Sequence, residues 1–144
     1  MFRVLLLLLY DALLVCLAIE DYKYQRIKNG YIKIILLLGL MSVIGIPEIN
    51  LGSRAAGMFI ISVPMGILGM FLPGSFGGGD VKLVFASGAF LGWKLVLKGT
   101  VVSIFLAGSY SVWLYFTKRK SKYVQFALGP FLSVGYIMAA FTLF

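Results

Sequence analysis

The sequence has no histidine, a single cysteine, and only five aspartate and glutamate residues in 144 positions. Without histidine, and with one cysteine that has no partner, the usual imidazole and thiolate metal-ligand sets are excluded, so we expect no metal and no cofactor. Charged residues make up 12% of the chain, against about 25% in soluble domains. Hydrophobic residues make up 61%, and the mean hydropathy is +1.01. This composition predicts an integral membrane protein.

The few acids leave a formal net charge of +8. In a membrane protein such an excess usually reflects topology and contact with anionic lipid. No basic stripe alternates with aromatic residues, which is the pattern expected of a nucleic-acid-binding surface. We therefore expect a lipid bilayer, and no nucleic acid, among the partners of this chain.

Polar residues divide the chain into six apolar segments, each close to the ~20 residues that span a bilayer. The segments are Val4–Ile19, Tyr31–Ile46, Arg54–Leu72, Val81 to about Leu97, Gly99–Phe116 and Tyr123–Phe144. The first has no A-x-A cleavage site after it, so we expect a retained span and not a cleaved signal. The pattern predicts one all-α domain over residues 1–144, a polytopic bundle of about six transmembrane helices. Small residues at helical spacing should let its helices pack closely: Gly66, Gly69, Gly88 and Gly92.

The orientation follows from two basic clusters, namely Lys23, Arg26 and Lys28 after the first segment, and Lys118, Arg119, Lys120 and Lys122 after the fifth. Such clusters favour the cytoplasmic side. With six spans the loop that ends at Asp80 lies on that side too. The opposite side then receives both chain ends and the remaining scattered charges, Arg3, Arg54, Lys94 and Lys98.

Two aspartates at the mouths of apolar segments are the candidate reactive groups. Asp21 ends the first segment, and Asp80 follows the glycine run Gly77–Gly79. Two carboxylates held close together share one proton, so the ionised member can activate a water molecule while the protonated member polarises a peptide carbonyl. Glycines before the acid allow close backbone approach. The alternative is structural: Asp80 stands where a helix N-cap belongs, and Asp21 has basic neighbours to pair with.

Four stretches of this chain, in the same order, resemble those of the type IV prepilin peptidases. They are Asp21 followed by Arg26-Ile27 and Asn29, Gly77-Gly78-Gly79-Asp80-Val81-Lys82-Leu83, Gly88-Ala89-Phe90-Leu91-Gly92-Trp93, and Leu128-Gly129-Pro130-Phe131-Leu132. The second is similar to the GxGD motif of that family. Jointly the four stretches span most of the chain.

The resemblance implies a membrane-embedded aspartic endopeptidase that serves pilus biogenesis or secretion. Such enzymes remove the short basic leader of prepilins and pilin-like precursors at the cytoplasmic face of the cytoplasmic membrane. By the match, the catalytic pair is Asp21 and Asp80, and the residues that support it are Gly77, Gly79, Lys82 and Asn29. The longer enzymes also carry a region with two CxxC pairs that is linked to N-methylation. Since no CxxC occurs here, we expect no methyltransferase activity. Lys28 stands where the family often has proline.

Two other functions are compatible with the acids. A non-enzymatic transporter or ion-pathway subunit would use Asp11, Asp21 and Asp80 as relay groups at several depths. A presenilin-like GxGD protease would cut within the bilayer, but such proteases have a tyrosine where this chain has Glu20. Since two of the three aspartates are expected at one membrane surface, the sequence favours the leader peptidase. Asp11 is then a structural acid, and Glu20 either a solvated helix end or a contact for a basic leader.

Overall fold

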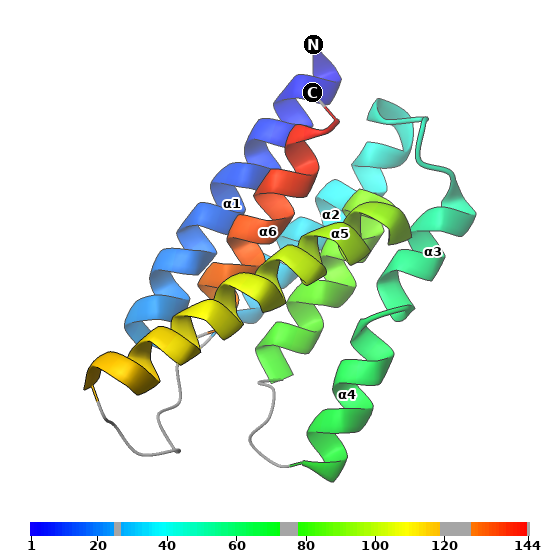
Figure 1. The fold of residues 1–144 in the computed structure, drawn as a ribbon. Coiled ribbons are helices and arrows are strands. Elements are labelled where there is room, and N and C mark those ends of the chain that lie inside the picture. The colour runs from blue at the N-terminus through cyan, green and yellow to red at the C-terminus, as the bar shows by residue number, and fades with distance from the viewer. Residues whose placement is uncertain (25–26, 73–77, 119–127, 144) are drawn as a thin grey trace.

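The computed structural model of the chain describes residues 1–24, 27–72, 78–118 and 128–143. Within these residues every regular element is an α-helix, and the helices pack side by side in one bundle (Figure 1). They are α1 (Phe2–Tyr24), α2 (Asn29–Gly45), α3 (Leu51–Phe59), α4 (Ser62–Phe71), α5 (Gly78–Lys118) and α6 (Gly129–Phe141). The prediction of an all-α fold is confirmed. Parts of the sequence-based predictions rest on Arg26, Gly77 and residues 119–127, which lie outside the described residues.

The exterior of the bundle is apolar, as a lipid-facing surface requires. Large hydrophobic side chains such as Leu8, Ile44 and Phe105 are 55–82% exposed. In the described part of the chain, three helical stretches are long and apolar enough to cross a membrane: Phe2–Tyr24, Leu51–Phe71 and Gly78–Thr117. α2 and α6 are apolar but shorter. The prediction of a membrane helical bundle is confirmed, although the spans are less uniform in length than the six segments expected.

A sharp kink divides α5 into two arms, which diverge from the upper end of the bundle in Figure 1. The kink lies at Gly92, with φ 79° and ψ 170°, a conformation that favours glycine. A Cβ atom here would lie 2.7 Å from Cγ2 of Ile49 and 2.8 Å from Oγ of Ser53. The sequence-based boundary near Leu97 is therefore wrong. The lysines that suggested it remain helical because their long side chains reach the surface.

The predicted segment Arg54–Leu72 is also divided. α3 ends at Phe59 and α4 begins at Ser62, close to Pro64. Proline lacks the N–H that would continue the hydrogen-bond ladder, which accounts for a break at this place. α3 approaches the first arm of α5 at backbone contact, because a Cβ on Gly88 would overlap with the carbonyl of Gly57. The predicted packing role of Gly88 therefore has a direct structural basis.

Arg54 joins three helices from a buried position, with only 4% of its surface exposed. Its guanidinium donates to the carbonyl oxygens of Ala89 and Phe90, at 2.9 and 3.1 Å, just before the kink. It also donates to those of Ser42 and Ile46, at 2.9 and 3.0 Å, at the end of α2. Helix C-termini leave carbonyls unpaired and carry partial negative charge, so a cation is stabilised there. The sequence-based prediction had instead placed Arg54 among the scattered charges on the side of the membrane opposite the basic clusters.

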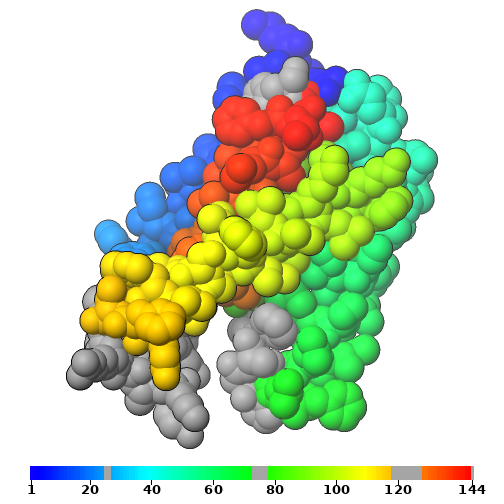
Figure 2. Space-filling view, in the orientation of Figure 1, coloured from blue at the N-terminus to red at the C-terminus, as the bar shows by residue number. Residues whose placement is uncertain are grey.

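The two ends of the bundle differ in what they carry. The beginning of α1 and the end of α6 lie at one end, which we call the terminal end (Figure 1). The end of α1 and the beginnings of α5 and α6 lie at the other, which we call the aspartate end because it holds Asp21 and Asp80. In Figure 2 the second arm of α5 crosses in front of α6, which packs against both α1 and α5.

Candidate active site

Asp21 lies in the last turn of α1 and is 5% exposed. Its Oδ2 accepts a hydrogen bond of 2.9 Å from the main-chain N–H of Gly129, the first residue of α6. This N–H belongs to a helix N-terminus, which carries partial positive charge and suits a carboxylate. A Cβ on Gly129 would overlap with the Asp21 carboxylate, so only glycine allows this approach. α6 therefore fixes the position of the Asp21 side chain.

Asp80 lies in the first turn of α5 and is partly buried. α5 begins at Gly78, so Asp80 is not the N-cap residue that the structural alternative required. Tyr136, a fully buried residue of α6, directs its hydroxyl at α5, the helix that carries Asp80. That hydroxyl is hydrogen-bonded to Oγ1 of Thr100 at 3.0 Å. α6 therefore contacts Asp21 directly and packs against the helix that carries Asp80.

The segment that follows Asp21 is docked on the segment that contains Asp80. Nζ of Lys82 donates a hydrogen bond of 3.2 Å to Oδ1 of Asn29. A Cβ on Gly79 would lie 2.9 Å from Cβ of Ile27. Lys82, Asn29 and Gly79 were all predicted from the sequence, and these two contacts bring the two motifs together at the aspartate end.

The glycines before Asp80 differ in their surroundings. A Cβ on Gly78 would meet no described atom within 4 Å, whereas one on Gly79 would press on Ile27. Among the described residues only Gly92 has a positive φ. Gly79 does not have such a φ, and its constraint is the closeness of Ile27. Gly77 is outside the described residues.

Glu20 is engaged within the chain. Its Oε1 lies 2.6 Å from Nζ of Lys28, and its side chain is 14% exposed against 68% for the lysine. The Glu20 carboxylate raises the pKa of the Lys28 ammonium above its usual value. This ion pair spans the turn between α1 and α2. Lys28 stands where the enzymes that this chain resembles often have proline. Its ion pair with Glu20 therefore stabilises the turn beside Asp21.

Asp11 lies about ten residues before Asp21 on α1 and is half-buried. Its Oδ1 has no hydrogen-bond partner among the described residues. On a helix, ten residues correspond to about 15 Å, so Asp11 lies well inside the bundle and away from the aspartate end. The structure does not bring it to the two candidate catalytic residues.

Sequence reasoning missed one contribution to this site. The Gly129 N–H that holds Asp21 is a main-chain group, and the type of the residue does not reveal that this group binds Asp21. Gly129 was noticed only through the resemblance of residues 128–132.

The fold and composition define a polytopic membrane protein. The chain matches the model of the type IV leader peptidase family over residues 7–112. It therefore belongs to that family of membrane peptidases. The match contains Asp21 and Asp80 and ends before α6. Neither the curated proteins nor the solved structures gave a match.

Proposed function

We propose that the chain is a membrane-embedded aspartic endopeptidase, with Asp21 and Asp80 as its catalytic pair. Its substrates are type IV prepilins or related pilin-like precursors, from which it removes a short basic leader. The observation that supports this most directly is the docking of the two motif segments through the Lys82–Asn29 hydrogen bond. The family match, which covers both aspartates, supports the same reaction.

The proposed chemistry needs only two carboxyl groups and water. One ionised carboxylate takes a proton from a water molecule while the water oxygen attacks the scissile carbonyl carbon. The other carboxyl group is protonated and donates a hydrogen bond to the carbonyl oxygen, where negative charge develops. The C–N bond then breaks, and the leaving amine takes up a proton. The Gly129 N–H would hold Asp21 in place throughout, because its bond to Oδ2 does not involve the substrate.

The position of the pair suits a leader peptidase. Lys23 and Lys28 lie at the aspartate end, and basic residues at membrane boundaries favour the cytoplasm. We therefore place the aspartate end at the cytoplasmic face of the inner membrane. A substrate with a basic leader and an apolar helix would keep its leader in the cytoplasm and its helix in the bilayer. The bond just before that helix then lies at the level of the two aspartates.

Asparagine variants test the pair. Asp21→Asn and Asp80→Asn retain side-chain volume and remove the titrating group, so each should reduce leader removal by roughly 10²–10⁴-fold. The measurement is the mobility shift of a co-expressed prepilin, with membrane levels compared by blotting. Asp11→Asn serves as the matched control and should process normally. A relay protein would instead need Asp11 as well. Substantial processing by either Asp21→Asn or Asp80→Asn would rule out the pair mechanism.

A further inference from the structure

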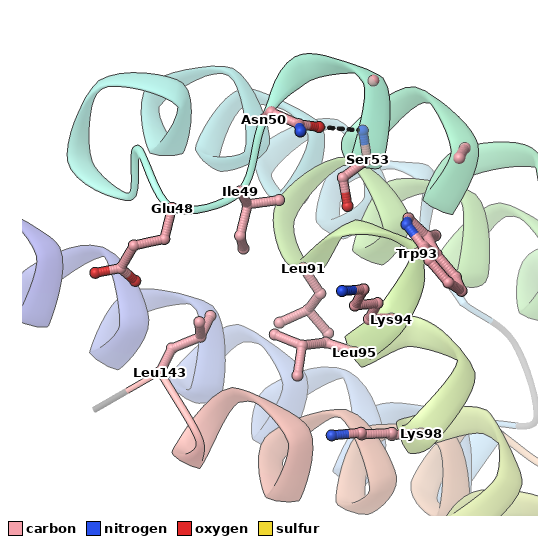
Figure 3. Close-up of a pocket in the computed structure, with 12 residues that line it drawn as sticks. Glu48, Ile49, Asn50, Ser53, Leu91, Trp93, Lys94, Leu95, Lys98 and Leu143 are labelled. Atoms are coloured by element: carbon pink, nitrogen blue, oxygen red, sulfur yellow. Dashed lines mark hydrogen bonds between the residues drawn. The ribbon is translucent and has the colours of Figure 1, made fainter.

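A pocket of about 580 Å³ lies at the terminal end of the bundle, far from the two aspartates, and Figure 3 shows the residues that line it. The α2–α3 link forms one wall and the region of α5 around the kink forms the other. Two kinds of surface meet in it. Ile49, Leu91, Leu95 and Leu143 give apolar walls, and Lys94 and Lys98 supply cationic groups.

The charge of this pocket is not balanced by the residues that line it. Lys94 and Lys98 are four residues apart on the second arm of α5, so they share a helix face, and Figure 3 shows both ammonium groups pointing to the same side. The acid that lines the pocket, Glu48, already has a partner, because its Oε1 lies 2.7 Å from Nη1 of Arg3. No ion pair to Lys94 or Lys98 is present in the described part of the chain. The pocket therefore has an excess of positive charge.

Two observations point to the ligand. The positive groups call for an anion, and a phosphate group is the anion that membranes supply in quantity. The pocket is much larger than a bare phosphate needs, and its volume is typical of sites for molecules of drug size. Its apolar walls would bury hydrocarbon that a free phosphate lacks. Trp93, which also lines the pocket, is the kind of residue that lies at the membrane–water boundary.

We propose that this pocket binds the phosphate headgroup of an acidic phospholipid, with Lys94 and Lys98 on the phosphate and the leucine walls on the first part of the acyl chains. The two ammonium groups suit the phosphate of such a lipid, and the apolar walls suit its hydrocarbon. The proposal also explains two lysines at the end opposite the basic loops, where the topology rule disfavours positive charge. It is independent of the proposed peptidase activity.

Trp93 makes the site observable. The chain has two tryptophans, so Trp113→Phe leaves Trp93 as the only indole reporter, and it lies in the pocket wall. Purified protein in detergent is titrated with brominated phosphatidylglycerol, which quenches indole fluorescence on contact, and in parallel with brominated phosphatidylcholine. We expect saturable quenching with a preference for phosphatidylglycerol. At about 1 kcal/mol for each lysine, Lys94→Gln/Lys98→Gln should reduce that preference roughly thirtyfold.

The controls separate the pocket from general charge effects. Lys23→Gln/Lys33→Gln removes the same charge from exposed positions of α1 and α2 and should leave the preference intact. Lys94→Arg/Lys98→Arg should retain it. Competition with glycerol phosphate at constant ionic strength distinguishes a site for a lipid headgroup from a site for a soluble phosphate compound. Displacement of the lipid by low millimolar glycerol phosphate would show a site for soluble phosphate, and equal losses in the two glutamine double variants would show that the pocket has no specific role. Either result would overturn the proposal.

Discussion

Replacing Gly129 with alanine should separate the catalytic geometry of Asp21 from the stability of the protein. An alanine Cβ would lie 2.7 Å from Cγ and 3.1 Å from Cβ of Asp21, whereas carbon atoms in contact settle near 3.5–4.0 Å. The carboxyl group must therefore retreat by about 1 Å, and its 2.9 Å hydrogen bond to the Gly129 N–H must lengthen. A displacement of about 1 Å at a reacting group reduces rate on the order of a hundredfold, which corresponds to about 2.7 kcal/mol in activation free energy.

The cost to folding is measured separately, because Gly129 is the first residue of α6 and precedes Pro130, so alanine gains nothing there from helix propensity. The assay compares the initial rate of leader removal with the thermal unfolding midpoint for Gly129→Ala and for Gly78→Ala. Gly78 is the matched control, since a Cβ there meets no described atom within 4 Å. A hundredfold loss in the first variant alone is expected. Normal turnover in Gly129→Ala would show that the position of Asp21 does not limit the reaction and would refute the reasoning.

Two further predictions concern the fold and its orientation. Gly92→Ala should lower the thermal unfolding midpoint by at least about 5 °C, because φ 79° costs an alanine roughly 1–3 kcal/mol and its Cβ has no room, whereas Gly108→Ala, with open space around it, should not. In a Cys16→Ser background, a single cysteine at Glu48 should react with an impermeant maleimide in intact cells, and one at Tyr24 only after permeabilisation. The reverse pattern would put the aspartate end outside the cell.

Hydropathy alone gave the helical bundle, because runs of apolar residues without strand-like alternation have few other solutions in a bilayer. It misplaced the turn between the two arms of α5. The polarity of Lys94 and Lys98 suggests a loop near these residues. The change of direction of α5 instead depends on the φ of Gly92, which cannot be predicted from polarity. Glycine is frequent in this chain, and nothing local distinguishes Gly92 from the glycines that only pack.

The candidate site was predictable to a similar extent. Asp21 and Asp80 were conspicuous because acids are rare here, and the motif resemblance added Asn29 and Lys82, which the structure joins by a hydrogen bond. The anchoring of Asp21 by α6 was not predictable. It depends on a main-chain N–H 108 residues away, and tertiary approach of this kind leaves no mark in a local pattern.

Arg54 has a consequence for the way the protein is built into the membrane. An arginine costs about 2.5–3.5 kcal/mol at the centre of an inserted helix and less near its ends, and Arg54 is the fourth residue of the stretch Leu51–Phe71. Four of the carbonyls that receive the Arg54 guanidinium come from the end of α2 and from the first arm of α5, and α5 is synthesised after α3. Arg54 therefore gains its carbonyl partners on α5 only after α5 has entered the bilayer beside the stretch Leu51–Phe71. In a nascent chain that stops before α5, we expect the stretch Leu51–Phe71 to be inserted incompletely. Its stable insertion should follow the entry of α5 into the bilayer.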